Sequence, residues 1–233
     1  MHDSNMSPEW IAKAWKQNPC VKLDNGDVRT GPVRLSFPHL LTPAKRRPGD
    51  DPDKADQYGA VLLFPLGADI SVLTKEMREV ALAKYPQAGK PGGPKLFNPI
   101  RDQDVDGKGQ PGEAERYAGY VKGAMRIGAN ANRKIQVVDR SLAPVIDDEK
   151  IYPGVWAIVT LRCFTFERQG NKGPTFGLQN VMLVADDTNI GGTGTANPRD
   201  AFAGVQIEAG DIDADKAFGE GAKAEETAID PFS

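Results

Sequence analysis

The chain has 233 residues, of which 39% are hydrophobic, which is enough for one β-rich domain with appendages or for two small domains. Its 25 glycines and 18 prolines favour many turns, and therefore β rather than helical architecture. With 2 cysteines there is no basis for a disulfide framework, and no apolar run is long enough to cross a membrane, so we expect a cytoplasmic protein.

The net charge of −3 is unevenly distributed along the chain. Residues 187–233 contain ten acids and three bases, a net charge of −7, whereas residues 1–186 contain 26 bases and 22 acids, a net charge of +4. A mildly basic body joined to an acidic tail suits a protein that binds polyanions and carries its own competitor.

Residues 1–30 are predicted to form an N-terminal extension with a short helix. Ser7 is in the position of an N-cap and Pro8 in that of the first helical residue. Trp10 and Trp15 would lie on the apolar side of this helix. Packing on the body or on a partner subunit explains them better than base stacking, although stacking stays open.

The body, residues 31–186, begins with two strands, Val33–Leu40 and Tyr58–Phe64, whose apolar residues alternate. Between them, Thr42–Asp56 has the composition of an exposed loop, and loops between the strands of a β-domain often bind ligands. Three consecutive bases in this loop are candidate phosphate contacts: Lys45, Arg46 and Arg47.

Asp69–Tyr85 is the main predicted helix, because its apolar residues recur at helical spacing until Pro86. Such a helix would cap the open end of a barrel. Ala88–Gly119 is rich in glycine and proline and is predicted to be a long loop. Tyr117–Gly128 and Lys134–Val138 are predicted as further strands.

The strongest predicted element is a β-hairpin with arms Val155–Phe166 and Thr175–Val184, joined by the polar stretch Arg168–Pro174. Side chains alternate across a strand, which predicts one small aliphatic face and one face of rings and a guanidinium. The second face comprises Trp156, Ile158, Thr160, Arg162, Phe164 and Phe166. Closing the loop at Gln169–Gly173 places Phe166 opposite Phe176, Phe164 opposite Leu178 and Arg162 opposite Asn180, and a slip of one residue would invert these faces.

An aromatic and basic strand face has two interpretations. The rings can fill the core of the barrel, with Arg162 reaching past them to water. Alternatively, the face is a stacking platform, on which bases of a single strand lie on the rings while cations neutralise phosphates. The hairpin by itself leaves both open.

The loop from Asp102 to Glu113 has the residue spacing of a calcium-binding EF-hand, with Asp104, Asp106 and Gly107 at the matching positions. Prolines stand where an incoming helix is required, so we predict a polar structural loop and no metal site. Its carboxylates crowd one loop instead of converging from separate strands, which argues against a two-metal nuclease. No nucleophile elbow, phosphate-cradling motif or zinc-spaced cysteine pair is found, so we predict no enzyme and no cofactor.

Residues 187–233 are predicted to be a flexible, disordered acidic tail. Its tip, with Ile229, Asp230, Pro231 and Phe232, resembles the acidic, Phe-ending tails of bacterial and phage single-stranded DNA-binding proteins, which dock on replication and repair partners. The chain departs from that pattern in ending on Ser233, which displaces the terminal carboxylate from the ring.

The body resembles the phage-encoded single-stranded DNA-binding proteins of OB-fold type. The resembling segments occur in consistent order and are residues 34–40, 58–63, the predicted helix, 100–104, 117–119, 151–154, 170–173, 177–181 and 191–192. Gly-Asn-Lys-Gly followed by Gly-Leu-Gln-Asn-Val is the most specific of them. The resemblance implies a mainly β, single OB-fold-like antiparallel barrel, sequence-independent binding of single strands, and a role in phage replication or recombination.

Together, these observations predict a single-stranded DNA-binding protein with two kinds of DNA contact. The predicted stacking residues are Tyr117, Tyr120, Trp156, Phe164 and Phe166. The predicted phosphate contacts are Lys45, Arg46, Arg47, Lys122, Arg126, Arg162, Arg168 and Lys172. Asp230 and Phe232 are expected to recruit replication or recombination proteins. A virion structural or assembly protein and a metal-dependent nuclease stay open as alternatives, and so does the oligomeric state, a homodimer included.

Overall fold

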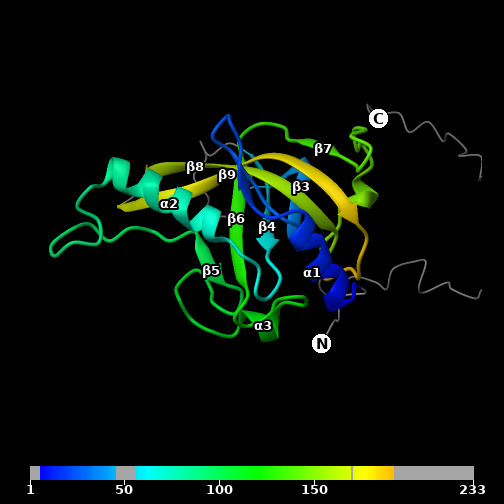
Figure 1. The fold of residues 1–233 in the computed structure, drawn as a ribbon, viewed down its shortest axis with the longest axis horizontal. Helices are drawn as coiled ribbons and strands as arrows, with labels where there is room; N and C mark the ends of the chain where they lie inside the picture. Colours follow the sequence, from blue (N-terminus) through cyan, green and yellow to red (C-terminus); the bar gives the residue numbers. More distant parts are fainter. Residues whose placement is uncertain (1–5, 46–55, 169, 192–233) are drawn as a thin grey trace, which may run out of the picture. The chain divides into compact units, whose positions relative to one another are not determined.

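A computed structural model describes residues 6–45, 56–168 and 170–191 of the chain (Figure 1). All of them belong to one compact unit, Met1–Gly194. The predictions for Arg46, Arg47, Asp230 and Phe232 lie outside the described residues. In the part of the chain that is described, no helix has the length and apolarity to span a membrane.

Five strands form the body of the fold, pairing in the order β8–β3–β4–β6–β9 with a further pairing of β9 to β8. They are β3 (Val33–Ala44), β4 (Gln57–Leu63), β6 (Met125–Ala131), β8 (Trp156–Arg168) and β9 (Asn171–Ala185). All neighbours are antiparallel except β6 and β9, which are parallel. β8 and β3 pair only at Val33–Ala157 and Arg34–Trp156, so the barrel is partly open, as in an OB-fold. The mainly β, OB-like prediction is confirmed.

Alternation along these strands directs one apolar set into the barrel. On β8 that set is Ala157, Val159 and Leu161, each at most 1% exposed. α2 (Ser71–Lys84), the predicted main helix, adds the fully buried Leu73 to the same core and lies beside the β8–β9 hairpin in Figure 1. The small aliphatic face predicted for the first hairpin arm is therefore the inside of the barrel.

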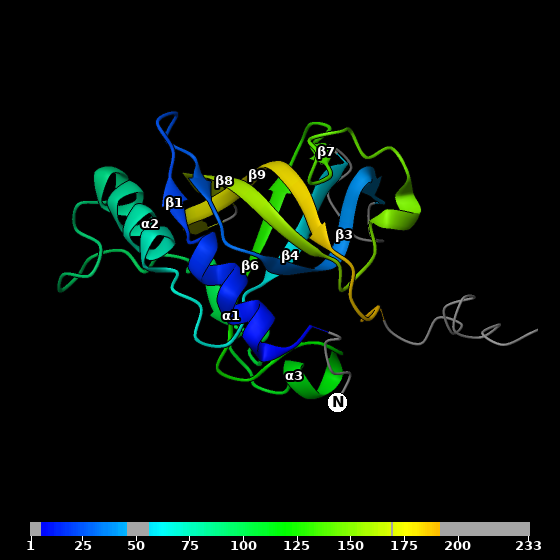
Figure 2. The same ribbon diagram turned by 45° about the vertical axis from the view of Figure 1, so that its right-hand side comes forward.

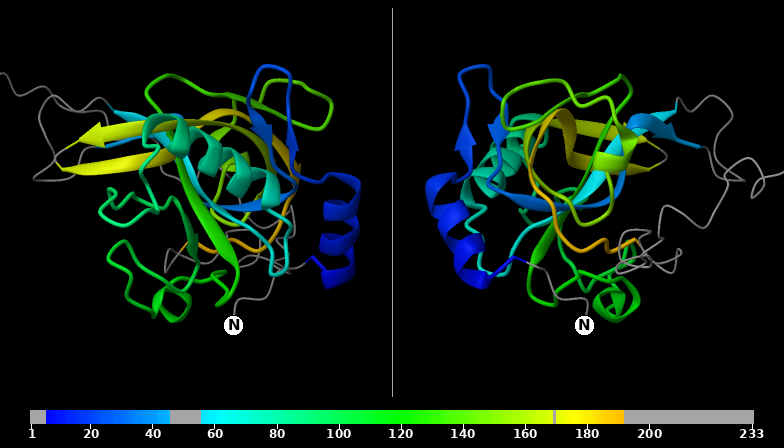
Figure 3. Two further views of the ribbon diagram at one scale, coloured as in Figure 1. Left: turned by 60° about the vertical axis from the view of Figure 1, so that its left-hand side comes forward. Right: turned by 90° about the vertical axis from the view of Figure 1, so that its right-hand side faces the viewer.

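The N-terminal extension packs on this barrel. α1 (Pro8–Gln17) is capped by Ser7, whose Oγ accepts a 3.2 Å hydrogen bond from the backbone N–H of Trp10. Trp15 is buried, and its indole N–H donates to the carbonyl of Pro32 at 2.7 Å. The short hairpin of β1 (Val21–Lys22) and β2 (Val28–Arg29) extends the sheet by pairing with β8; Figure 3 shows it on the same side of the barrel as α1. The structure agrees with the preferred interpretation, in which the two tryptophans pack on the body.

Four short elements complete the described chain. They are β5 (Ile100–Asp102), α3 (Glu113–Arg116), β7 (Gln136–Val138) and the 3-10 helix η1 (Asp148–Lys150). The predicted strand Tyr117–Gly128 is wrong in its first part, because turns occupy the chain up to Ala124 and strand β6 starts at Met125. Gly119 and Gly123 allow these turns, with φ of 79° and 84° in the left-handed region.

The predicted hairpin register is also wrong. Arg168 pairs directly with Asn171, which leaves a two-residue connection where a longer loop was expected. The aromatic side chains consequently face other partners: Phe166 lies opposite Gly173, Phe164 opposite Thr175 and Arg162 opposite Gly177. Because the shift is an odd number of residues, Phe176 points into the barrel, opposite Cys163, rather than toward Phe166.

The ordered body continues past residue 186, where the sequence placed the start of the tail. Asp187 and Ile190 are buried, at 9% and 6% exposure. The Asp187 carboxylate lies 3.2 Å from Nε of Arg34 and accepts a 2.7 Å hydrogen bond from the indole N–H of Trp156. Burial lowers the pKa of Arg34, and the Asp187 charge opposes that shift. This buried ion pair and a 2.9 Å hydrogen bond from the Ile190 N–H to the carbonyl of Pro153 hold residues 187–190 on the barrel.

Candidate nucleic-acid interface

Beyond Leu161, the β8–β9 hairpin leaves one of its faces uncovered. Cys163 faces the core and α2, and burial raises the pKa of its thiol to about 12. The residues alternating with it point the other way: Phe164 is 46% exposed and Phe166 is half-buried. The rings therefore stand on the outer face of the hairpin, as the stacking interpretation requires.

A groove of 630 Å³ runs along this outer face, and we call it the hairpin groove. It is lined by Gln57, Phe97, Asn130, Ala131, Asn132, Arg133, Phe164, Phe166, Thr175, Phe176, Gly177, Leu178 and Gln179. Phe97 comes from the long loop before β5, and its ring meets that of Phe166 edge-on at 5.6 Å between centroids. The groove thus combines a largely apolar lining with amide side chains and one guanidinium.

Glycine forms part of the floor of the hairpin groove. Gly177 pairs with Asn130 of β6, and a Cβ atom on Gly177 would lie 3.1 Å from Cε1 of Phe164. The bare backbone at this position lets the Phe164 ring lie over β9 instead of standing away from it. A larger residue would displace the ring that lines the groove.

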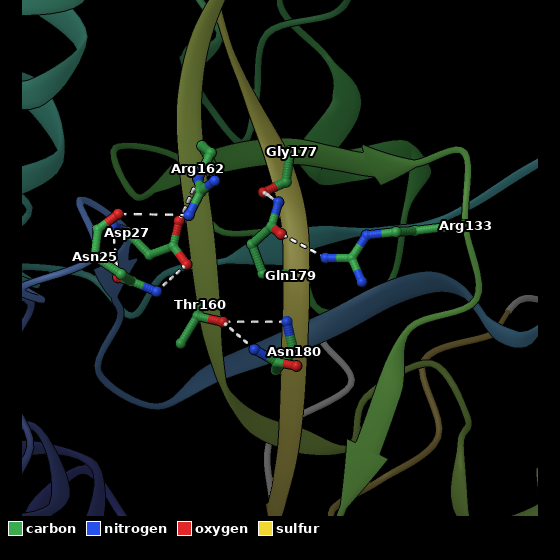
Figure 4. A network of polar contacts seen from close by, with 8 residues as sticks. All are labelled: Asn25, Asp27, Arg133, Thr160, Arg162, Gly177, Gln179 and Asn180. Carbon is green, nitrogen blue, oxygen red and sulfur yellow. Dashed lines mark hydrogen bonds and ion pairs between the residues drawn. The ribbon is translucent and has the colours of Figure 1, made fainter.

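Two arginines flank the groove differently, as Figure 4 shows. Arg133 extends over β9 and donates a 2.7 Å hydrogen bond to the neutral amide of Gln179. Arg162, on β8, points to the other side and forms a 2.7 Å ion pair with the buried Asp27 carboxylate. Among the described residues Arg133 has no carboxylate partner, whereas the charge of Arg162 is balanced by that of Asp27.

The ends of the basic β3–β4 loop lie next to the groove. Ala44 pairs with Gln57, which lines the groove and donates a 3.3 Å hydrogen bond to Asn132. Lys45 follows directly after β3 and is exposed. Lys45, the first residue of the basic run, is therefore held beside the hairpin groove.

A second group of rings lies on the outer face of β3 and β4. Phe37 is 50% exposed and meets Tyr117 edge-on at 5.5 Å, and Tyr117 lies 5.4 Å from Tyr120. The guanidinium of Arg116 stands over the Tyr117 ring at 5.2 Å. We call these four residues the Phe37 cluster. It packs on Leu63 and Val61, whose side chains point out of the barrel.

A family model described as the ssDNA-binding protein of Enterobacter phage Enc34 matches residues 26–216. The chain belongs to this family. The resemblance to phage single-stranded DNA-binding proteins is thereby confirmed.

Solved structures of phage proteins share the fold of this Enc34-family chain. The single-stranded DNA-binding protein from bacteriophage Enc34 in complex with ssDNA has 24% identity and a TM-score of 0.57, over 74% of this chain and 93% of that one. A structure of the same Enc34 protein described without a ligand has 23% identity and a TM-score of 0.55, over 78% and 93%. The single-stranded DNA-binding protein gp2.5 of bacteriophage T7 has 14% identity and a TM-score of 0.50, over 73% and 98%. No match was found among curated proteins.

Two of the predicted stacking residues of this family member are buried. Trp156 is 2% exposed and lies between α1, where it meets Trp10, and the Asp187 carboxylate. Tyr120 is 8% exposed, and burial raises the pKa of its phenol. Neither ring offers a face to a base, so their predicted stacking role is wrong for this conformation. Tyr117, Phe164 and Phe166 stay available.

The predicted phosphate contacts are distributed over several surfaces. Lys122 is exposed but lies 3.8 Å from the Asp104 carboxylate. Lys172 lies on the side of the hairpin toward α2, with its ammonium 5.8 Å from the ring of Tyr85. Arg168 is exposed at the end of β8. The structure therefore does not bring the predicted phosphate-binding side chains together in one patch. Arg133 is better placed than Lys172 to contact a strand in the hairpin groove.

The carboxylates with EF-hand spacing organise their own loop. Asp102, Asp104 and Asp106 each accept hydrogen bonds from backbone N–H groups, for example from Ala114 to Asp104 at 3.1 Å and from Gln110 to Asp106 at 2.8 Å. These bonds lower the pKa of Asp106. Among the described residues, no group of three or more His, Cys, Asp or Glu side chains is placed to hold a metal ion. The spacing thus has a structural explanation.

Sequence reasoning missed Phe97 and Arg133 of the hairpin groove and Phe37 and Arg116 of the Phe37 cluster. Phe97 is in a glycine- and proline-rich loop without periodicity, so no pattern marks it. The Phe37-Pro38 pair did carry a signal, because it interrupts strand alternation and coincides with a register shift between Ser36 and His39.

Proposed function

We propose that this chain binds single-stranded DNA without sequence preference and without catalytic turnover, in phage DNA replication, recombination or repair. The observation that carries the proposal is the hairpin groove: aromatic rings line one open strand face, together with the Arg133 guanidinium, which has no carboxylate partner among the described residues. Membership in the Enc34 family supports the same conclusion.

The groove suits an unpaired strand. Phe97, Phe164 and Phe166 offer ring surface to bases, and each base–ring stack contributes about 1–3 kcal/mol whatever the base. Asn132 and Gln179 offer amide groups that hydrogen-bond to base edges or sugars. Arg133 and the basic side chains of the β3–β4 loop would neutralise phosphates. Because counterions are released when the strand binds, the affinity would fall with salt concentration. A duplex hides its base faces and lacks this mode of binding.

The acidic residues after Gly191 would act as a competitor and as a recruiting segment. The residues after Gly191 are chemically a polyanion, with nine acids and three bases and a net charge of −6, and they can occupy the same cationic surface as DNA. Asp230 and Phe232 would contact replication or recombination proteins. Deleting residues 211–233 should therefore tighten binding to single strands, and unchanged or weaker binding would contradict the competitor role.

Fluorescence anisotropy with labelled oligo-dT and with duplex, at two salt concentrations, tests the proposal. We expect binding to oligo-dT that weakens steeply with salt, with a slope of about −0.7 per neutralised phosphate, and much weaker binding to duplex. A virion structural protein would show no salt-sensitive affinity. A nuclease would shorten labelled DNA in Mg²⁺ and lose that activity on Asp104→Asn. No binding of oligo-dT at low salt would refute the proposal.

A further inference from the structure

The hairpin groove and the Phe37 cluster are linked by a pair of arginines that no prediction had brought together. Arg101 of β5 and Arg126 of β6 are direct cross-strand partners. Their neighbours in the same register, Ile100 and Ile127, are buried in the barrel. Alternation therefore places both guanidinium groups on the outer face, between the two groups of rings.

The guanidinium groups connect these rings in an unbroken series. Arg101 stands over Phe97 of the hairpin groove, with 4.8 Å from Cζ to the ring centroid. Arg126, its cross-strand partner, stands 5.9 Å from the ring of Tyr120 in the Phe37 cluster. The series then continues from Tyr120 to Tyr117 by a tilted ring contact and from Tyr117 to Phe37 by the edge-on contact described above. The arginine pair thus lies between the rings of the hairpin groove and those of the Phe37 cluster on the outer face.

Backbone carbonyls, and no carboxylate, hold the two arginines in place. Arg101 donates to the carbonyl of Asp106 at 3.0 Å, and Arg126 donates to that of Val105 at 2.5 Å. In the described part of the chain, neither guanidinium forms an ion pair with a carboxylate, and Nε of the Arg126 side chain is buried without a hydrogen-bond partner. Like charges directly opposite each other on two strands are unfavourable unless an anion lies between them.

The pKa of Arg101 agrees with this arrangement. Burial lowers it, the neighbouring charge of Arg126 lowers it further, and the charge of the Asp106 carboxylate opposes the shift. A bound anion would remove the repulsion between the two guanidinium groups. The structural role of the loop 102–113 also becomes clear, because its carboxylates fold it so that its carbonyls face the two arginines.

We infer that Arg101 and Arg126 together bind one backbone phosphate of a single DNA strand that runs from the hairpin groove to the Phe37 cluster. Guanidinium groups bind phosphate oxygens through charge-assisted hydrogen bonds. The strand would place bases on Phe164 and Phe166 before this phosphate and on Tyr117 and Phe37 beyond it. Gly128 of β6 keeps the sheet surface low beside Arg126, because it is exposed and a Cβ atom there would meet no atom within 4 Å.

The backbone at Phe37 supports a ligand-binding role for its ring. Phe37 has a φ of 48°, in the left-handed region that a bulky residue rarely adopts, and its side chain is nevertheless half exposed. Such strain persists where the surrounding structure enforces it, and it is concentrated at binding sites. Replacing Phe37 by glycine relieves the strain and deletes the ring, so stability and affinity should respond in opposite ways.

The experiment measures oligo-dT affinity as a function of length, from about 4 to 20 nucleotides, a span that covers the site size of one OB-fold. Variants are Arg101→Gln, Arg126→Gln, their double variant and Phe37→Gly. Arg78→Gln is the matched control, because it removes the same charge from the exposed side of α2. Thermal unfolding of every variant checks folding, and Arg101→Lys provides a variant that keeps the charge.

The longest oligonucleotides would reach from the hairpin groove to the Phe37 cluster. We expect each arginine variant to bind them about tenfold more weakly than wild type, with a salt slope smaller by about 0.7. The double variant should lose little more, since both side chains share one phosphate. Phe37→Gly should bind long oligonucleotides at least about fivefold more weakly, bind the shortest ones normally and unfold no earlier than wild type. Arg101→Lys should retain part of the affinity, and Arg78→Gln should bind normally.

This inference rests on the proposed function, but the two fail in different ways. If wild type does not bind oligo-dT, the proposed function fails. If wild type binds oligo-dT, but the arginine variants and Phe37→Gly bind every length as tightly as Arg78→Gln does, the inference is wrong. The hairpin groove would then bind the strand without the arginine pair or the Phe37 cluster. Additive losses in the double variant would also overturn it, because they would assign separate phosphates to the two arginines.

Discussion

The two halves of strand β8 each carry aromatic residues on the same side of the strand, but their surroundings differ. Trp156 and Phe164 lie on the same side of the strand by alternation, yet the first is 2% exposed and the second is 46% exposed. α1, through Trp10, and the segment around Asp187 cover Trp156 in the first half, and Figure 2 shows α1 on the outside of the barrel. No described element covers the outer face of the second half.

This difference shows what turns a row of aromatic residues into a binding surface. Both halves offer rings, and the ring in the first half is large enough to stack on a base. Neighbouring elements decide which rings stay accessible, and these neighbours come from residues 8–17 and 187–191, far from β8 in the sequence. The comparison can be tested by mutating each half and measuring stability and affinity separately.

Trp156→Ala should have the largest effect, and it should act on stability. Deleting a buried tryptophan leaves a cavity beneath α1 and removes the hydrogen bond to Asp187, so the free energy of unfolding should fall by about 3–5 kcal/mol. Urea denaturation measures this loss. The fraction that stays folded should bind oligo-dT with wild-type affinity, and a specific loss of affinity would return Trp156 to the interface.

Asp187→Asn should destabilise the first half by about 3 kcal/mol, because it leaves the buried guanidinium of Arg34 without its counter-charge. Thermal unfolding should show the loss, and Asp186→Asn provides an exposed neighbour as the control. Equal stability of the two variants would show that Asp187 does not fasten the chain to the barrel.

The barrel and its main helix could be predicted from the sequence because they depend on local patterns. Alternation marked Val33–Leu40 and Tyr58–Phe64, and helical spacing marked Asp69–Tyr85, all within a few residues of the observed bounds. The register of the hairpin was not predictable in the same way, because Gly170 permits a tight turn where a polar stretch suggested a loop. The shorter turn shifts the pairing by an odd number of residues, so every ring on β8 faces a different partner from the one predicted.

The candidate interface was predictable only in part, because it is assembled from distant segments. Phe164 and Phe166 could be found from strand alternation. Phe97, Arg101 and Arg133 become neighbours of these rings only through tertiary pairing, which a single sequence does not display. Burial of Trp156 depends on α1 and residue 187 and was equally invisible.

Phe164→Ala, in the second half of β8, should lower affinity and leave stability nearly unchanged, which is the reverse of the effect of Trp156→Ala. The ring is half exposed, so its loss should lower the free energy of unfolding by less than about 1 kcal/mol, while affinity for oligo-dT falls by about 1–3 kcal/mol. Anisotropy titration and urea denaturation of the same preparation separate the two quantities. A stability loss as large as that of Trp156→Ala, with affinity unchanged, would make Phe164 a core residue.

The smallest expected effect distinguishes the two arginines of Figure 4 by their partners. Arg133 bonds to a neutral amide, so Arg133→Gln should reduce the salt slope of oligo-dT binding by about 0.7, one phosphate contact, with little change in stability. Arg162 already neutralises Asp27, so Arg162→Gln should leave the slope nearly unchanged and lower stability by about 1–3 kcal/mol, as the buried carboxylate loses its cation. The reverse result would mean that DNA displaces Asp27 from Arg162, and that the charge of a side chain in the free protein does not determine which arginine contacts phosphate.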